Sequence, residues 1–427
     1  MVVRRLILPA ESSSRIVPLL VVVLILVVPW VKLELRPSIS IVEVLFIFLV
    51  SAILIQSLVE RSILPSHVIR EDFGLVIAVW LIAVLCSGLN VPHPRSYLFE
   101  AGGMFYLGAL SIVVAIISAL GTRMFQRVIH WLTYSVVIVA IVSLVGIAKV
   151  VITGHYDLFF YSNAAKLIAT FKYPNQLAGF LVLFLPLAWE LLLGNRGSRR
   201  VAYGLLLLVM LGGVAASGSR SGLAAIGLIM GIYFAWYLLR GNVKIVLGLA
   251  MAGGVTIALI YSLESHIGAI ARGLTVLNTI LVQGHVTDSF RLRNWSNALV
   301  IFQAHPVAGY GLGNICRDFV YEVHNTYLSI LAEMGLIGAV ALILLLGYIL
   351  YISYQNTRLV RIMPQWDPYA RGLFMGLVAE CIYATQHVMI RSRHLWLVFG
   401  LVIAMNTLLR RAKKRGGENS VRNLRDT

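Results

Sequence analysis

Continuous apolar runs of about 20 residues recur along the whole chain, and they constrain its fold more than any other feature. Only helices and closed barrels span lipid, because every backbone polar group must be paired inside the protein there. Barrel strands are short segments of alternating polarity, whereas these runs are continuous. Hydrophobic residues make up 59% of the chain and charged residues 12%, which excludes a soluble globular domain and a disordered chain. The sequence therefore predicts an all-α integral membrane protein.

We expect about twelve transmembrane helices in a single polytopic membrane domain that comprises residues 1–427. The first run lacks a small-residue cleavage site, so we expect a retained span rather than a signal peptide. The predicted spans lie near residues 15–31, 39–57, 73–89, 97–120, 128–152, 175–193, 200–216, 221–239, 243–263, 325–352, 370–389 and 393–409.

The distribution of basic residues predicts the orientation of these spans. With the N-terminus in the cytoplasm, 22 Lys and Arg residues fall in cytoplasmic segments and twelve in outer segments. Cytoplasmic loops carry the excess of Lys and Arg in membrane proteins, so we expect both termini to be cytoplasmic. This rule accounts for the net charge of +17 without nucleic acid binding. The basic tail, residues 410–427, is then a stop signal and a contact for anionic membrane lipids.

The outer loop between the ninth and tenth spans covers residues 264–324. A loop of this length usually has a function. Residues 266–282 and 289–304 within it have the periodicity of amphipathic helices, which suits the membrane surface. A shorter outer loop covers residues 153–174.

Several outer basic residues oppose the charge rule, and the first is Arg220 in a turn at 217–222. The glycines of this turn let the backbone approach a ligand, and Ser219 or Ser221 can cap the next helix, whose N-terminus favours an anion. A guanidinium adds a bidentate grip on phosphate. The alternative is an arginine that snorkels to the interface.

Two more arginines begin a predicted helix in the long loop. Arg291 and Trp295 share a face of this helix, whereas Arg293 does not, so at most one arginine points with the tryptophan. A solvated helix start is the alternative. At the end of the loop, His324 precedes Asn325, a good N-cap for the tenth span. A neutral imidazole there can take a proton from a hydroxyl, although a lone interfacial histidine is more often structural.

Other polar features give weaker signals. The glycine-rich stretch 305–314 lacks the strand and the Gly-Lys-Ser/Thr of a nucleotide site. No spacing typical of metal ligands occurs, and the three cysteines are scattered. Glu43, Lys149, Glu190 and Glu380 fall within predicted spans, which makes them functional candidates by default. Lys149 and Glu190 lie near span ends, where snorkelling suffices, whereas Glu43 and Glu380 have no assigned role.

Taken in order along the outer side, four segments resemble the bacterial O-antigen ligase and O-antigen polymerase superfamily of polytopic glycosyltransferases. The resemblance covers roughly residues 170–340. Its segments are Tyr173–Ala178, the turn Gly218–Gly222, Arg291-Leu292-x-x-Trp295 followed by Pro306 and Gly309–Gly313, and His324-Asn325 separated by nine intervening residues from Gly335-Leu336-Ile337-Gly338.

The resemblance implies a C-type glycosyltransferase fold that acts on the periplasmic face of the inner membrane. The donor would be an undecaprenyl-pyrophosphate-linked glycan and the acceptor a sugar hydroxyl of lipid A-core, with inversion and with neither metal nor cofactor. We assign His324 to the acceptor hydroxyl, and Arg220 and Arg291 to the leaving pyrophosphate. Further candidates for binding phosphate or sugar are Arg293, Asn325 and Lys172.

Two other functions stay open at this stage. A polymerase would use the same donor and a second lipid-linked unit as acceptor, but the spacing from His324-Asn325 to Gly335 favours a ligase. A transporter fits twelve spans with scattered glutamates, but the polar residues gather at the outer surface rather than at the bilayer midplane.

Overall fold

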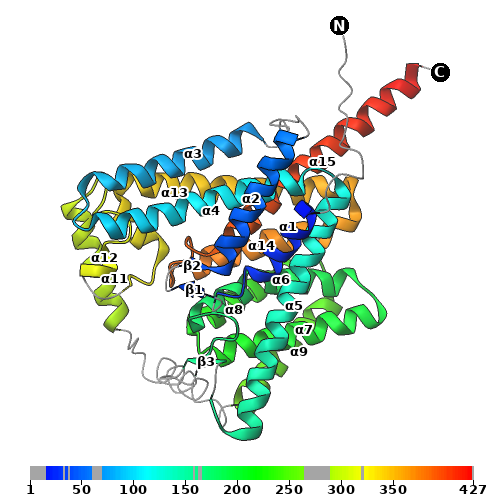
Figure 1. Ribbon diagram of the computed structural model, residues 1–427. Coiled ribbons are helices and arrows are strands. Elements are labelled where there is room, and N and C mark those ends of the chain that lie inside the picture. Colours follow the sequence, from blue (N-terminus) through cyan, green and yellow to red (C-terminus); the bar gives the residue numbers. More distant parts are fainter. Residues whose placement is uncertain are drawn as a thin grey trace.

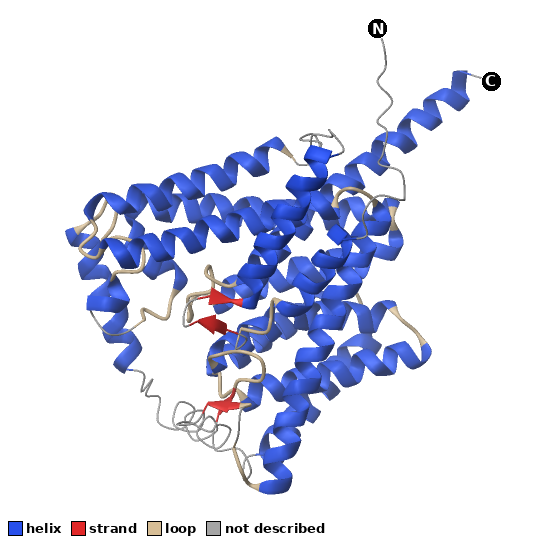
Figure 2. Cartoon of the chain, viewed as in Figure 1, coloured by secondary structure: helices blue, strands red, loops and turns tan. Residues whose placement is uncertain are grey.

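The computed structural model describes residues 16–31, 34–36, 39–59, 70–156, 159–161, 166–263, 289–318 and 322–425. Helices make up nearly all of this part of the chain, as predicted (Figure 2). Two antiparallel pairs of very short strands, which the sequence did not predict, lie in the connections between helices. These strands are β1 (Glu34–Arg36) with β2 (Ile39–Ser40) and β3 (Phe160–Tyr161) with β4 (Lys166–Leu167).

The helices follow the predicted order (Figure 1). The first half of the chain forms α1 (Ile16–Val27), α2 (Ile41–Val59), α3 (Glu71–Cys86), α4 (Pro94–Ser118), α5 (Thr122–Thr153) and α6 (Pro174–Gly194). The second half forms α7 (Gly197–Ala216), α8 (Arg220–Leu239), α9 (Val243–Leu263), α11 (Ser289–Ala304), α12 (Ile315–Asp318), α13 (Thr326–Leu359), α14 (Asp367–Tyr383) and α15 (Arg393–Arg425). Short 3-10 helices are η2 (Ser87–Asn90), η3 (Val360–Ile362) and η4 (Pro364–Trp366).

Eight helices in the described residues are long and apolar enough to cross a membrane. They are α3, α4, α5, α6, α7, α8, α13 and α15. The other four predicted spans coincide with α1, α2, α9 and α14, which are not among the eight. The chain is therefore a multi-pass helical membrane protein, and the count of twelve spans stays a prediction.

The two innermost helices are α6 and α15. In their most apolar windows 83% and 78% of residues are buried, against 33% in α3, α7 and α8. A helix that is apolar on all sides belongs inside a bundle, and α6 has this composition. Helix α14 packs along α6, and α15 packs along α4. Two glycines of α14 permit the close approach, because a Cβ at Gly372 would lie 2.6 Å from Leu187 Cα and one at Gly376 would meet the carbonyl oxygen of Leu183.

The tenth predicted span is interrupted, which corrects the expectation of one continuous helix. Gly335 has φ +62° and ψ −159° within α13. Residues from the glycine-rich loop pair with the backbone that the break exposes: Gly311 N donates to Glu333 O at 2.9 Å, and Leu336 N donates to Pro306 O at 2.9 Å. Gly309 has φ +77°, and a Cβ there would overlap the Glu333 backbone. Gly309 therefore allows the loop to pack closely against α13.

Three other predicted segments have different outcomes. A helix is present at the predicted residues 289–304, as α11, whereas the segment 266–282 lies outside the described residues. The basic tail continues α15 as helix to Arg425. The span predicted at 370–389 is too long, because α14 ends at Tyr383 and a non-helical segment follows before α15.

Candidate functional site

Segments far apart in the sequence meet at His387, in the connection between α14 and α15. Ser221 Oγ of α8 lies 3.0 Å from His387 Nε2. The ring of His324 lies 5.8 Å from the His387 ring, centroid to centroid, at an interplanar angle of 81°. Arg291 Nη1 of α11 donates to Gln386 Oε1 at 2.7 Å. We call Ser221, Arg291, His324, Gln386 and His387 the His387 cluster.

The residue that follows the predicted His-Asn pair fixes the connection 384–392 in place. The Thr326 amide donates to the carbonyl oxygen of Ala384 at 2.8 Å. Its hydroxyl donates to the carbonyl oxygen of His387 at 2.6 Å and accepts from the amide of Met389 at 2.9 Å. The start of α13 and the connection 384–392 therefore form one hydrogen-bonded unit, which explains why α14 stops before the predicted end of the span.

The turn that contains Arg220 joins the cluster through its serines. Arg220 is the exposed first residue of α8. Ser219 caps this helix by accepting from Gly222 N at 3.2 Å, which confirms one of the two predicted caps. Its hydroxyl also lies 3.2 Å from Tyr383 Oη. Arg220 immediately precedes Ser221 in the chain, and Ser221 contacts His387 directly.

His324 has an unusual backbone conformation. Its φ of +54° lies in the left-handed region, which costs a non-glycine residue about 1 kcal/mol or more and is concentrated at functional sites. Asn325 caps α13 as predicted, because its side-chain oxygen accepts from Leu328 N at 3.0 Å. His324 Nδ1 lies 3.6 Å from Glu322 Oε2. The cap and this contact hold the imidazole towards His387.

The remaining predicted site residues lie around the cluster at different depths. Arg293 is exposed on α11, so of the two arginines it is Arg291 that enters the cluster. Lys172 is half-buried before α6, close in sequence to Asn175, whose carbonyl oxygen accepts from Tyr383 Oη at 3.0 Å. Trp295 and Tyr310 both pack against a small apolar cluster that α11, α12 and α13 form.

His387 is a site residue that sequence reasoning missed. It was placed inside the span predicted at 370–389, although the polar run Thr385-Gln386-His387 at its outer end was a signal that the span stops earlier. Burial, followed by the nearby Arg291 and His324, lowers the pKa of His387 to about 3. The imidazole is therefore neutral at physiological pH and can share one hydrogen bond with Ser221 without adding charge to the site.

Two further arginines, for which the sequence alone predicts no role, are engaged in ion pairs. Arg391 Nε lies 3.2 Å from Glu100 Oε2, and its Nη2 lies 2.9 Å from Glu333 Oε2. Arg393 pairs with Glu43, which also accepts from the Ser40 amide. Glu43 therefore lies at the start of α2 and is paired with Arg393. This ion pair gives Glu43 a structural role, which the sequence alone did not assign.

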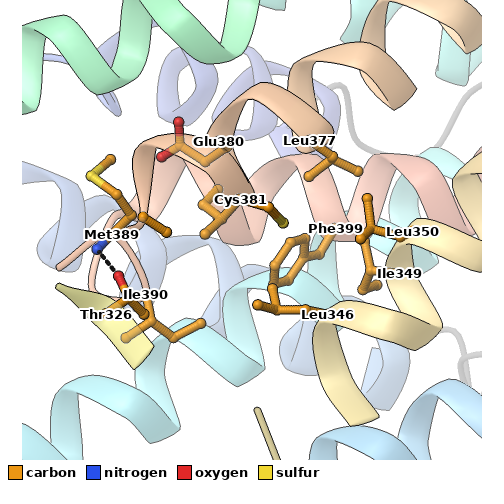
Figure 3. Close-up of a pocket in the computed structure, with 12 residues that line it drawn as sticks. Thr326, Leu346, Ile349, Leu350, Leu377, Glu380, Cys381, Met389, Ile390 and Phe399 are labelled. Carbon is orange, nitrogen blue, oxygen red and sulfur yellow. Dashed lines mark hydrogen bonds between the residues drawn. The ribbon is translucent and has the colours of Figure 1, made fainter. Parts of the chain in front are cut away.

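Beside the cluster, a small cavity of about 20 Å³ lies between α13, α14 and α15 (Figure 3). Its volume suits a single water molecule. Thr326 and Met389 border it, and Glu380 and Cys381 reach it from α14. Glu380 is 2% exposed, and within the described residues neither of its carboxylate oxygens has a hydrogen-bond partner. The structure thus locates Glu380 next to the site without giving it a contact in the cluster.

The cluster contains groups that can bind an anion and accept a proton. Arg291 brings a guanidinium, which binds phosphate oxygens in a bidentate manner, and His324 brings an imidazole. Within the part of the chain that the structure describes, no group of three or more His, Cys, Asp or Glu side chains is placed to hold a metal ion.

Fold and site together define a multi-pass helical membrane protein with arginine and histidine side chains gathered at one end of the bundle. Residues 205–343 match a family model described as O-antigen ligase. This segment, about a third of the chain, is therefore similar to a family whose members are O-antigen ligases. No curated protein matches the chain. The matched segment includes Arg220, Arg291 and His324, whereas His387 lies beyond it.

Proposed function

We propose that the protein is an O-antigen ligase of lipopolysaccharide biosynthesis in the bacterial inner membrane. It transfers a glycan from undecaprenyl pyrophosphate to a sugar hydroxyl of lipid A-core on the periplasmic face, with both termini in the cytoplasm. The observation that carries this proposal is the meeting of Arg291 and His324 at His387, beside the turn that bears Arg220. The family match to residues 205–343 is the second support.

In the proposed reaction the acceptor oxygen attacks the anomeric carbon as the bond from that carbon to the pyrophosphate oxygen breaks. The electron pair of this bond leaves with the pyrophosphate, so negative charge grows there in the transition state. Arg220 and Arg291 stabilise this charge, and the loss of one such positioned donor costs about 100- to 1000-fold in rate. Attack from the face opposite the leaving group inverts the anomeric centre.

The proton of the acceptor hydroxyl goes to His324, whose left-handed backbone directs its ring towards the cluster. A base of this kind contributes about 100- to 10,000-fold. Lys172, Arg293 and Asn325 contact phosphate or sugar at the edge of the site. The two guanidiniums supply the positive charge that a metal ion supplies in many phosphate enzymes, so we expect the reaction to need no divalent cation.

The test is transfer by the purified protein in detergent, with a defined polyprenyl-pyrophosphate glycan and each acceptor in turn. We expect transfer to lipid A-core at a rate that a chelator leaves unchanged. Transfer only to a second lipid-linked glycan would instead identify a polymerase. A strict requirement for a divalent cation would contradict the role given to the arginines, and a failure to act on any acceptor without a membrane gradient would favour transport.

A further inference from the structure

A second basic site lies on α13 and α15. The first residues of these two helices flank the His387 cluster, and the second site lies far along both helices from that cluster. The late part of α13 and the part of α15 around 410–414 enclose a groove of about 720 Å³. Six of its lining side chains are cationic or aromatic, and no acidic residue lines it. They are Tyr351, Tyr354, Arg358, Arg410, Lys413 and Lys414.

Hydrogen bonds hold the basic side chains on both walls of the groove. Arg410 Nη2 on α15 donates to Gln355 Oε1 on α13 at 2.7 Å. Arg358 Nε donates to Tyr354 Oη at 3.0 Å, and its guanidinium carbon lies 5.2 Å from the centroid of that ring. The neighbouring Arg411 points elsewhere, because its Nη1 donates to the carbonyl oxygen of Ala119 at the end of α4 at 3.1 Å. Three basic residues of the tail, Arg410, Lys413 and Lys414, therefore line the groove, whereas Arg411 has a structural role.

The position of the groove indicates which anion it accepts. Both helices are long apolar spans, and the groove lies where each of them ends in polar residues. Tyrosines gather at the boundary between membrane and water, and Tyr351 and Tyr354 are both exposed. Basic pockets between helices at this depth bind phosphorylated lipid headgroups. Four cations line the groove, so a headgroup with two phosphates balances its charge better than a headgroup with one.

We propose that this groove binds the headgroup of an anionic phospholipid that carries two phosphodiesters, as in diphosphatidylglycerol. The phosphates lie between Arg358 and Arg410, and Lys413 and Lys414 close the outer edge. The acyl chains lie along the apolar surface of α13. This site is independent of the proposed transfer reaction, because it lies at the other end of both helices.

The experiment measures the thermal unfolding midpoint of the full-length protein in detergent while lipid is added. Diphosphatidylglycerol should raise the midpoint in a saturable manner, whereas phosphatidylcholine and inorganic pyrophosphate should not. The variant Lys413→Gln/Lys414→Gln, which changes only exposed side chains, should weaken the apparent affinity. Adding Arg410→Gln should weaken it about tenfold or more relative to the unmodified protein.

The matched control removes the same charge elsewhere, with Arg196→Gln/Arg199→Gln/Arg200→Gln at the exposed start of α7. This control should keep the full response to diphosphatidylglycerol. If the control and the groove variants lose the response equally, the effect is one of overall charge and the proposed site is wrong. If pyrophosphate shifts the midpoint as strongly as the lipid does, the groove binds a soluble phosphate and the assignment to a lipid is overturned.

Discussion

At the residue scale, His387 shows how the cluster keeps a neutral group among cations. Its side chain is 4% exposed, with Arg291 and His324 nearby. Burial disfavours the charged form of this ring, and the nearby Arg291 and His324 add to the effect, which is why its pKa falls to about 3. A neutral ring at hydrogen-bond distance from Ser221 fixes the turn of α8 against the connection 384–392. The positive charge of the site then comes only from the groups that would face the pyrophosphate.

This environment predicts that acid destabilises the protein through His387. The unfolded state takes up a proton near pH 6.5 and the folded state only near pH 3, so the stability from this group is lost as pH falls from 6.5 towards 3. At one pH unit below 6.5 the loss is about 1 kcal/mol. Thermal unfolding midpoints between pH 5 and 7.5 should therefore vary less in His387→Gln than in the unmodified protein.

The control for this measurement is His155→Gln, since His155 is exposed at the end of α5. That variant should keep the acid loss of the unmodified protein. An identical pH profile in His387→Gln would mean that the ring is not held neutral by its surroundings.

The site residues divide into those that local sequence predicts and those that it does not. Arg220, Arg291 and His324 are marked by their neighbours in sequence: a glycine-serine turn, a helix start and a capping asparagine. The polar run that includes His387 indicates only that the span ends early, and it does not mark a site, because the partner Ser221 lies 166 residues away. Arg391 and Glu333 are likewise paired across 58 residues. Pairs of this kind depend on how the helices pack, which hydropathy does not describe.

At the element scale, the break in α13 shows why a predicted span differs from the helix that forms. The hydropathy of 325–352 is continuous, so the pattern predicts one helix. A positive φ at Gly335 becomes stable because the loop 306–311 supplies hydrogen bonds to the exposed backbone. The partner loop lies outside the predicted span, and its glycines by themselves indicate only a flexible stretch. Their contact with α13 is seen only in the folded structure. The break therefore follows from tertiary contact rather than from local propensity.

The contact between α14 and α6 yields a second prediction. Gly372→Ala/Gly376→Ala adds methyl groups where a Cβ would meet the Leu187 and Leu183 backbone. Small residues at this spacing let membrane helices approach closely, so the variant should push α14 away from α6 and lower the unfolding midpoint. Overpacking of this kind costs about 1–3 kcal/mol. Because α14 carries Tyr383 towards Ser219, transfer activity should fall as well.

Helix α8 offers the matched control at the same spacing. A Cβ at Gly227 or Gly231 meets nothing within 4 Å, so Gly227→Ala/Gly231→Ala should keep or slightly raise the unfolding midpoint. Equal losses in both variants would show that the effect comes from glycine replacement in general and not from the α14–α6 contact.

At the scale of the whole molecule, hydropathy predicts the order of the helices. It does so because each apolar run must be helical in lipid, whatever its neighbours. What it does not predict is the inner position of α6 and α15, the two small strand pairs or the non-helical connection 384–392. These depend on which helices face each other. The resulting molecule has an arginine and histidine cluster at the starts of α13 and α15 and a basic groove near their ends.

The most direct measurement of the central claim is the initial rate of glycan transfer by purified Arg291→Ala, compared with Arg293→Ala from the same helix. Arg291 contacts Gln386 in the His387 cluster, whereas Arg293 is exposed. The account predicts that Arg291→Ala lowers the rate by about 100-fold or more, while Arg293→Ala lowers it far less and both proteins keep their unfolding midpoints. Full activity in Arg291→Ala, or equal losses in the two variants, would contradict the account.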